Sequence, residues 1–246
     1  MKKLALSTAV LFIILSGLWA FQFSPIEAFI RPSGSDSVRS YTIVNDSEDP
    51  IAISLSVVRR DQDETGQEIR TECNDFQILP SKIIVQPNSS YVVRVRYMGP
   101  QNITAERPYR LIAEQIPYSQ GKNQEGGAMF NFLFIYATSL YVLPAESKVQ
   151  VDVSAVKEGV SEDGERVLEV TVRNKGNIHQ ILLDTHLTLK DSKGQTITLE
   201  GEQIPNLDGF NLLARKTVTR TVPWPEGWEP EGKITGIIRY QSPQQQ

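Results

Sequence analysis

The chain has 246 residues, a formal net charge of −4 at pH 7, 40% hydrophobic residues and 22% charged residues. This composition is ordinary for a soluble globular protein, and the length allows one large domain or two of about 100 residues each. The acidic balance argues against a nucleic-acid-binding surface, which would need an excess of basic residues.

The first twenty residues have the layout of a secretory signal peptide. Lys2 and Lys3 form a short positive segment, and the run Leu4–Leu18 is almost entirely apolar but short for a membrane span. Ala20 is the expected last residue before cleavage. We therefore expect export across a bacterial inner membrane, with no stable membrane insertion afterwards. An uncleaved N-terminal anchor is the alternative, because Trp19 is larger than the residues preferred near the cleavage site.

The next part of the chain predicts strands and turns only. Apolar and polar residues alternate in short segments that are separated by Asn, Asp, Gly and Pro, and no segment combines a helical period with a cap. The predicted strands are Ser37–Val44, Ile51–Val57, Phe76–Leu79, Ile83–Val85, Tyr91–Tyr97, Arg107–Gln115 and Met129–Leu143. Short strands at spacings of roughly 8–12 residues are typical of a β-sandwich.

The second half repeats this pattern. Its predicted strands are Val149–Val153, Val167–Val172, Ile181–Leu189, Thr196–Leu199, Thr217–Val222 and Lys233–Tyr240. Pro144 follows the longest predicted strand and marks the expected boundary between domains. The sequence thus predicts an all-β protein with a signal peptide (1–20), a first sandwich domain (21–144) and a second sandwich domain (145–246).

The strand predicted over Met129–Leu143 is apolar on both of its faces. Alternation places four aromatic residues on one face, and these are Phe130, Phe132, Phe134 and Tyr136. A strand with two apolar faces is either buried on both sides or available to a partner chain. On this pattern alone two interpretations stay open. These residues either fill the core of their own domain or contact a partner chain.

The sequence carries no signature of catalysis or of a metal or cofactor site. Motifs such as G-x-S-x-G, H-E-x-x-H or a glycine-rich phosphate loop are absent. A single cysteine, Cys73, excludes an intramolecular disulfide and is expected to be a buried small residue or a free thiol. His179 and His186 are too few for most metal sites. We therefore predict a non-enzymatic protein without a cofactor.

Four segments occur in an order that points to a known family. They are Tyr41–Asp46 followed by Pro50, Ile83–Pro87, Arg107–Pro117 and the strand Met129–Pro144. In these segments, and in having two β-domains behind a signal peptide, the chain resembles the PapD-like periplasmic chaperones of the chaperone–usher pathway. The resemblance covers essentially the whole mature chain.

The resemblance implies two immunoglobulin-like domains in a boomerang arrangement. It also implies a periplasmic chaperone that caps pilus or fimbrial subunits and delivers them to an outer-membrane usher. In the family, the last long strand of the first domain completes the fold of a subunit that lacks one strand. Phe130, Phe132 and Phe134 fall at the family's donor positions, which favours the intermolecular reading. With Tyr136 on the same face, these are the four predicted donor residues.

The chain departs from the family at the anchor for the subunit's C-terminal carboxylate. Ser139 stands at the usual lysine position, Phe29 at the usual arginine position, and Leu143 at the position of an inter-domain arginine. These departures suggest a divergent branch, such as the archaic chaperones or those that serve spore-coat-U-like subunits. The candidates for a substitute anchor are Arg110, Arg107 and Arg31. The alternative for Arg110 is an exposed charge at a strand edge.

Two other classes of function remain open on the sequence. The chain could be a secreted structural or adhesive β-sandwich protein, or a periplasmic binding module unrelated to pili. A pilus subunit itself would need a longer N-terminal extension of alternating hydrophobic residues than Phe21-Gln22-Phe23 provides.

Overall fold

The computed structural model describes residues 21–118 and 132–243 of the chain. The expected signal peptide and Phe130 lie outside these residues. The described residues form β-strands and two short 3₁₀ helices, Ser35–Ser37 and Gly201–Gln203, and none of their helices is long and apolar enough to cross a membrane. The prediction of an all-β chain is confirmed.

The N-terminal half contains two sheets. The first has the order β1 (Gln22–Ser24), β3 (Val38–Asn45), β8 (Ser89–Tyr97) and β6 (Phe76–Leu79). The second has the order β2 (Glu27–Ile30), β10 (Ile135–Val142), β9 (Arg107–Ile116), β4 (Ile51–Gln62) and β5 (Glu68–Glu72), with β7 (Lys82–Val85) paired to β4. Neighbouring strands are antiparallel except β2 and β10, which are parallel.

A single hydrophobic core lies between these two sheets. On β8, Val93 and Val95 are buried while Arg94 and Arg96 between and beyond them are exposed, as the period-2 alternation of a half-buried strand requires. On β9, Leu111 is one of the buried residues that meet them from the opposite sheet. This alternation fixes which face of each strand remains outside the core.

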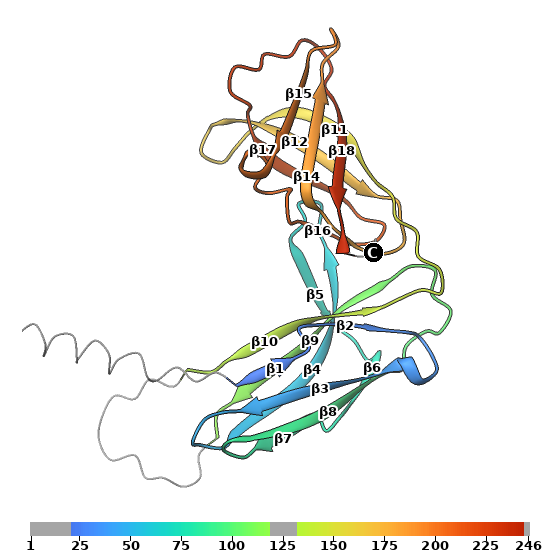
Figure 1. Cartoon of the computed structure of the whole chain (residues 1–246), viewed down its shortest axis with the longest axis vertical. Coiled ribbons are helices and arrows are strands. Elements are labelled where there is room, and N and C mark those ends of the chain that lie inside the picture. Colours follow the sequence, from blue (N-terminus) through green and yellow to red (C-terminus); the bar gives the residue numbers. More distant parts are fainter. Residues whose placement is uncertain (1–20, 119–131, 244–246) are drawn as a thin grey trace, which may run out of the picture.

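The C-terminal half has its own core and three small sheets. These are β11 (Val151–Val160), β12 (Arg166–Asn174) and β17 (Thr217–Pro223); β15 (Thr196–Glu200), β14 (Leu183–Lys190) and β18 (Thr235–Gln241); and β13 (Gln180–Ile181) with β16 (Asn211–Leu212). The second core is built from aliphatic side chains of these strands together with Trp228. The two halves meet at an angle, as Figure 1 shows.

The β4–β5 hairpin reaches from the first half to the second (Figure 1). The side chain of Gln62 donates to the carbonyl of Asn211 at 2.7 Å and accepts from the backbone N–H of Leu213 at 3.0 Å. At the tip, Gly66 has a φ of +86°, and a Cβ there would lie 2.6 Å from the ring of Phe210. Glycine is therefore required for this close contact.

A buried carboxylate–imidazole contact and an aromatic stack also lie at the junction. The Glu106 carboxylate lies 2.7 Å from Nδ1 of His179, and both side chains are fully buried. The His179 ring stacks on Tyr141, with centroids 4.0 Å apart, and Tyr141 stacks on Phe29. Phe29 thus occupies the usual arginine position with a packing role at the junction.

The strand that was predicted to begin at Met129 begins later among the described residues. β10 spans Ile135–Val142, and its pairing with β9 ends at Ile135 opposite Glu114. Beyond this point one further bond is formed, from the N–H of Gln115 to the carbonyl of Phe134 at 2.9 Å. β9 itself continues to Ile116, paired there with β4.

Candidate functional site

Strand β10 is paired on both sides over only half of its length. β9 accompanies it from Ile135 to Val142, but β2 accompanies it only from Ser139 to Val142. On the β2 side, the N–H of Ser139 donates to the carbonyl of Ile26 and the N–H of Leu143 donates to that of Ile30, both at 2.9 Å.

Backbone alternation then gives the direction of the neighbouring amides. Successive N–H groups of a strand point to opposite edges. The amides of Ile135 and Ala137 therefore point to the same edge as that of Ser139, where β2 has no residue opposite them. Within the described residues, this stretch of β10 is an open strand edge.

Two of the four predicted donor residues face the core of their own domain. Tyr136 pairs with the buried Ala113, and both Phe134 and Tyr136 pack against the first core. The Tyr136 hydroxyl also donates to the carbonyl of Phe21 at 2.5 Å. The register with β9 thus turns the face of Phe134 and Tyr136 toward the core of their own domain. Contact between these residues and a partner chain stays a prediction.

The exposed apolar side chains lie at the start of the strand and on its other face. Phe132 is 65% exposed, Leu133 is 48% exposed and Ile135 is 61% exposed. Ile135 shares its face with Ala137 and Ser139. The fourth predicted residue, Phe130, lies outside the described residues.

Arg110 lies on this same face and reaches β10. It pairs with Ser139 across the strands, and its Nη1 donates to the Ser139 hydroxyl at 2.7 Å. Its Nε and Nη2 donate to the carboxylate of Glu68, with distances from 2.6 to 3.2 Å. The alternative of an exposed charge at a strand edge is wrong, because the Arg110 side chain is 18% exposed and β9 lies between β10 and β4. Arg110 stands beside the position where the family places its lysine.

Two further arginines converge on the same carboxylate. Nε of Arg60 lies 2.8 Å from Glu68, and Nε of Arg70 lies 2.6 Å from it. We call Arg60, Arg70, Arg110 and Glu68 the arginine cluster. Burial alone would raise the pKa of Glu68, but hydrogen bonds from Arg110 and Arg70 and the charges of Arg110 and Arg60 outweigh it and hold the pKa at about 2.

The arginine cluster is also connected to the second half of the chain. Nη1 of Arg60 donates to the hydroxyl of Tyr141 at 3.0 Å, and the same hydroxyl accepts from Nδ2 of Asn211 at 3.0 Å. Arg60 and Glu68 were not among the predicted anchor residues. Both lie between the predicted strands Ile51–Val57 and Phe76–Leu79, and no local pattern indicates that a hairpin brings them beside Arg110.

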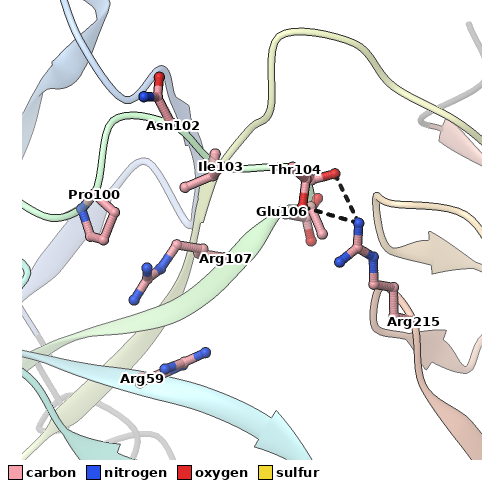
Figure 2. A pocket seen from close by; sticks show the side chains of 9 residues that line it. Arg59, Pro100, Asn102, Ile103, Thr104, Glu106, Arg107 and Arg215 are labelled. Atoms are coloured by element: carbon pink, nitrogen blue, oxygen red, sulfur yellow. Dashed lines mark hydrogen bonds between the residues drawn. The ribbon is translucent and has the colours of Figure 1, made fainter.

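The other two anchor candidates lie apart from the arginine cluster. Arg107 donates to Asp75 at 2.9 Å, and Figure 2 shows it with Arg59 in a pocket of about 300 Å³ that Arg215 of the second half also lines. Arg31 donates to the carbonyl of Pro144 at the junction. Of the three candidates, Arg110 is the one that contacts β10 at Ser139.

Sequence comparison assigns the part of the chain that carries this site. Residues 27–148 match the family described as pili and flagellar-assembly chaperone, PapD N-terminal domain. The chain belongs to the PapD-like pilus chaperones. No curated protein matches it in sequence.

Solved structures share the whole two-domain fold. A chain from a chaperone–tip adhesin complex of CFA/I fimbriae has a TM-score of 0.56 at 15% identity, covering 91% of this chain and 99% of that one. A chain from the CsuC–CsuE complex of the archaic Csu pili of Acinetobacter baumannii has a TM-score of 0.56 at 15% identity, covering 89% and 92%. A chain from the Salmonella enterica SafA pilin–SafB chaperone complex has a TM-score of 0.56 at 13% identity, covering 92% and 98%.

Proposed function

We propose that this pilus chaperone binds a pilus, fimbrial or related surface-fibre subunit by donor-strand complementation along β10 and delivers it to an outer-membrane usher. The open edge of β10 is the observation that carries the proposal. There, exposed Leu133 and Ile135 accompany backbone amides that have no strand opposite them.

An open edge of this kind favours strand addition. An incoming strand would satisfy the amides of Ile135 and Ala137, and main-chain hydrogen bonds would supply affinity without regard to subunit sequence. The exposed side chains of Phe132, Leu133 and Ile135 would enter the apolar groove of the subunit. Because Phe134 and Tyr136 already pack inward, we assign the contact to Leu133 and Ile135 in their place.

The proposal includes a carboxylate anchor at Arg110. A subunit's C-terminal carboxylate needs a charged and preferably bidentate partner when it leaves water. The guanidinium of Arg110 lies on the face of Ile135 and next to Ser139. An anchor there would set the register of the added strand, because Ser139 lies four residues after Ile135 on β10.

The neighbouring structures agree with such a role. Two of them are complexes of a chaperone with a tip subunit, and a third is a complex of a chaperone with a pilin. The layout of residues 1–20 supports export and a periplasmic location. We take residues 21–144 and 145–246 as the two domains of the mature chaperone.

Co-purification tests the proposal. The tagged mature chain is co-expressed with the pilus subunit of its own assembly system, and the recovered material is analysed for a one-to-one complex. A complex formed with the full subunit, and lost when the subunit carries its own donor strand fused in place, is the expected result. Equal recovery of the self-complemented subunit would contradict strand donation, and incorporation of the chain itself into fibres would favour a structural role.

A further inference from the structure

The positive charges of the arginine cluster outnumber its single negative charge. Three guanidinium groups surround one carboxylate, which leaves a net charge of two positive units, and every ion pair that Arg60, Arg70 and Arg110 make within the described part of the chain goes to Glu68. The side chains of Arg60, Arg110 and Glu68 are mostly buried. Such a site has capacity for a second carboxylate.

Arg110 divides its donors between Glu68 and β10. Nε and Nη2 point to the Glu68 carboxylate, while Nη1 points to the hydroxyl of Ser139. The hydroxyl is a neutral acceptor and binds less strongly than a carboxylate would. A carboxylate that arrives at Ser139 would therefore compete with Glu68 for the same guanidinium.

Glu68 does not depend on Arg110 alone. Arg60 and Arg70 contact the same carboxylate at 2.8 and 2.6 Å. If Arg110 turned toward an incoming carboxylate, Glu68 would keep two cationic partners and would not be left as an unpaired buried charge. The exchange is therefore possible without disrupting the hairpin.

We propose that Glu68 is an internal occupant of the carboxylate anchor. It accepts hydrogen bonds from Arg110 in the free chaperone, and some of these bonds go to the carboxylate of a partner when that carboxylate binds. This inference rests on the proposed function, in which Arg110 is the anchor. Glu68 then lowers the affinity for free carboxylates and reserves the anchor for a subunit whose strand is bound to β10. Because its pKa is about 2, Glu68 stays charged at neutral pH, so competition and not protonation releases Arg110.

A small carboxylate provides a direct test. Sodium acetate is titrated into the mature chain at constant ionic strength, and the ¹⁵Nε resonance of Arg110 is followed, with acetamide as the neutral control. Glu68→Gln is expected to bind acetate at least about tenfold more tightly than the wild type, since each charge-assisted hydrogen bond is worth about that much. Glu72→Gln, an exposed carboxylate on the same strand and face, should bind as the wild type does.

Removing Glu68 leaves three close cations, so Glu68→Gln is checked for folding by its melting transition. Glu68→Asp keeps the charge on a shorter side chain, and an acetate affinity between those of the wild type and Glu68→Gln is expected for it. Equal acetate affinity in the wild type, Glu68→Asp and Glu68→Gln would overturn the proposal.

Subunit capture separates this proposal from the one on which it rests. If Arg110→Gln captures a co-expressed pilus subunit as well as the wild type does, the anchor at Arg110 is refuted. If Arg110→Gln weakens capture and Glu68→Gln does not strengthen acetate binding, the anchor stands and the internal occupant is refuted.

Discussion

Ile135→Asp should abolish subunit capture while leaving the free chaperone folded. Full burial of an isoleucine side chain is worth about 1.5–3 kcal/mol. Ile135 is 61% exposed in the free chain, so burial against a subunit still offers about 1–2 kcal/mol. An aspartate at this position would also have to lose its hydration, which adds about 1–3 kcal/mol. We expect affinity to fall about a hundredfold or more.

The assay compares subunit binding and thermal stability for matched variants. Ile237→Asp is the control, because Ile237 is also an isoleucine on a strand and is 66% exposed, but it lies in the second half of the chain on β18. Both variants should unfold within about 0.5 kcal/mol of the wild type. Equal loss of binding in both, or unchanged binding in Ile135→Asp, would refute strand donation by this face. Phe134→Asp should instead destabilise the fold, since Phe134 packs against the core.

The remaining predictions concern the arginine cluster and the junction. Arg110→Gln should weaken subunit capture by roughly 2–5 kcal/mol in binding assays, the cost of removing one partner of a buried charged pair; unchanged affinity would exclude the anchor. The pKa of Glu68 in the folded chain is lowered to about 2 from its ordinary value of 4.5, so the stabilisation that ionised Glu68 gives is present above pH 4.5 and is lost as the pH falls toward 2. Acid unfolding of Arg110→Gln should therefore begin at a higher pH than in the wild type, and coincident acid transitions would contradict this. Glu106→Ala should cost about 1–3 kcal/mol in denaturant unfolding, because it removes the buried carboxylate that lies 2.7 Å from Nδ1 of His179; a cost below about 0.5 kcal/mol would show that this contact is dispensable. Gly66→Val should lower the melting temperature through its positive φ and its clash with Phe210, whereas Gly164→Val, at a positive φ with open space around it, reports the backbone effect alone.

The alternation of apolar and polar residues predicted where the strands lie. Which face of a strand turns toward the core depends on its pairing with other strands. The repeated alternation around Val93 and Val95 was enough to predict a half-buried strand. The strand that contains Phe134 and Tyr136 is apolar on both faces, so alternation alone could not predict which face turns inward. That choice depends on the register with β9, where the buried Ala113 stands opposite Tyr136, and no local pattern encodes it.

The arginine cluster shows a second limit of sequence reasoning. Arg110 was a candidate because of its place on the strand next to β10, and the structure brings it to Ser139. Glu68 and Arg60 lie 42 and 50 residues away from it in sequence. The long β4–β5 hairpin brings them to Arg110. Its length was underestimated because the predicted strand ended at Val57, whereas β4 continues to Gln62 through polar residues.

Hydrogen exchange tests the central claim, that β10 binds a subunit through its open edge. The amides of Ile135 and Ala137 point to the open edge, whereas those of Tyr136 and Thr138 point to β9 and serve as internal controls. In the free chaperone we predict fast exchange at Ile135 and Ala137 and slow exchange at Tyr136 and Thr138. In the complex with a pilus subunit all four should exchange slowly. Continued fast exchange at Ile135 and Ala137 in a stable complex would contradict the account.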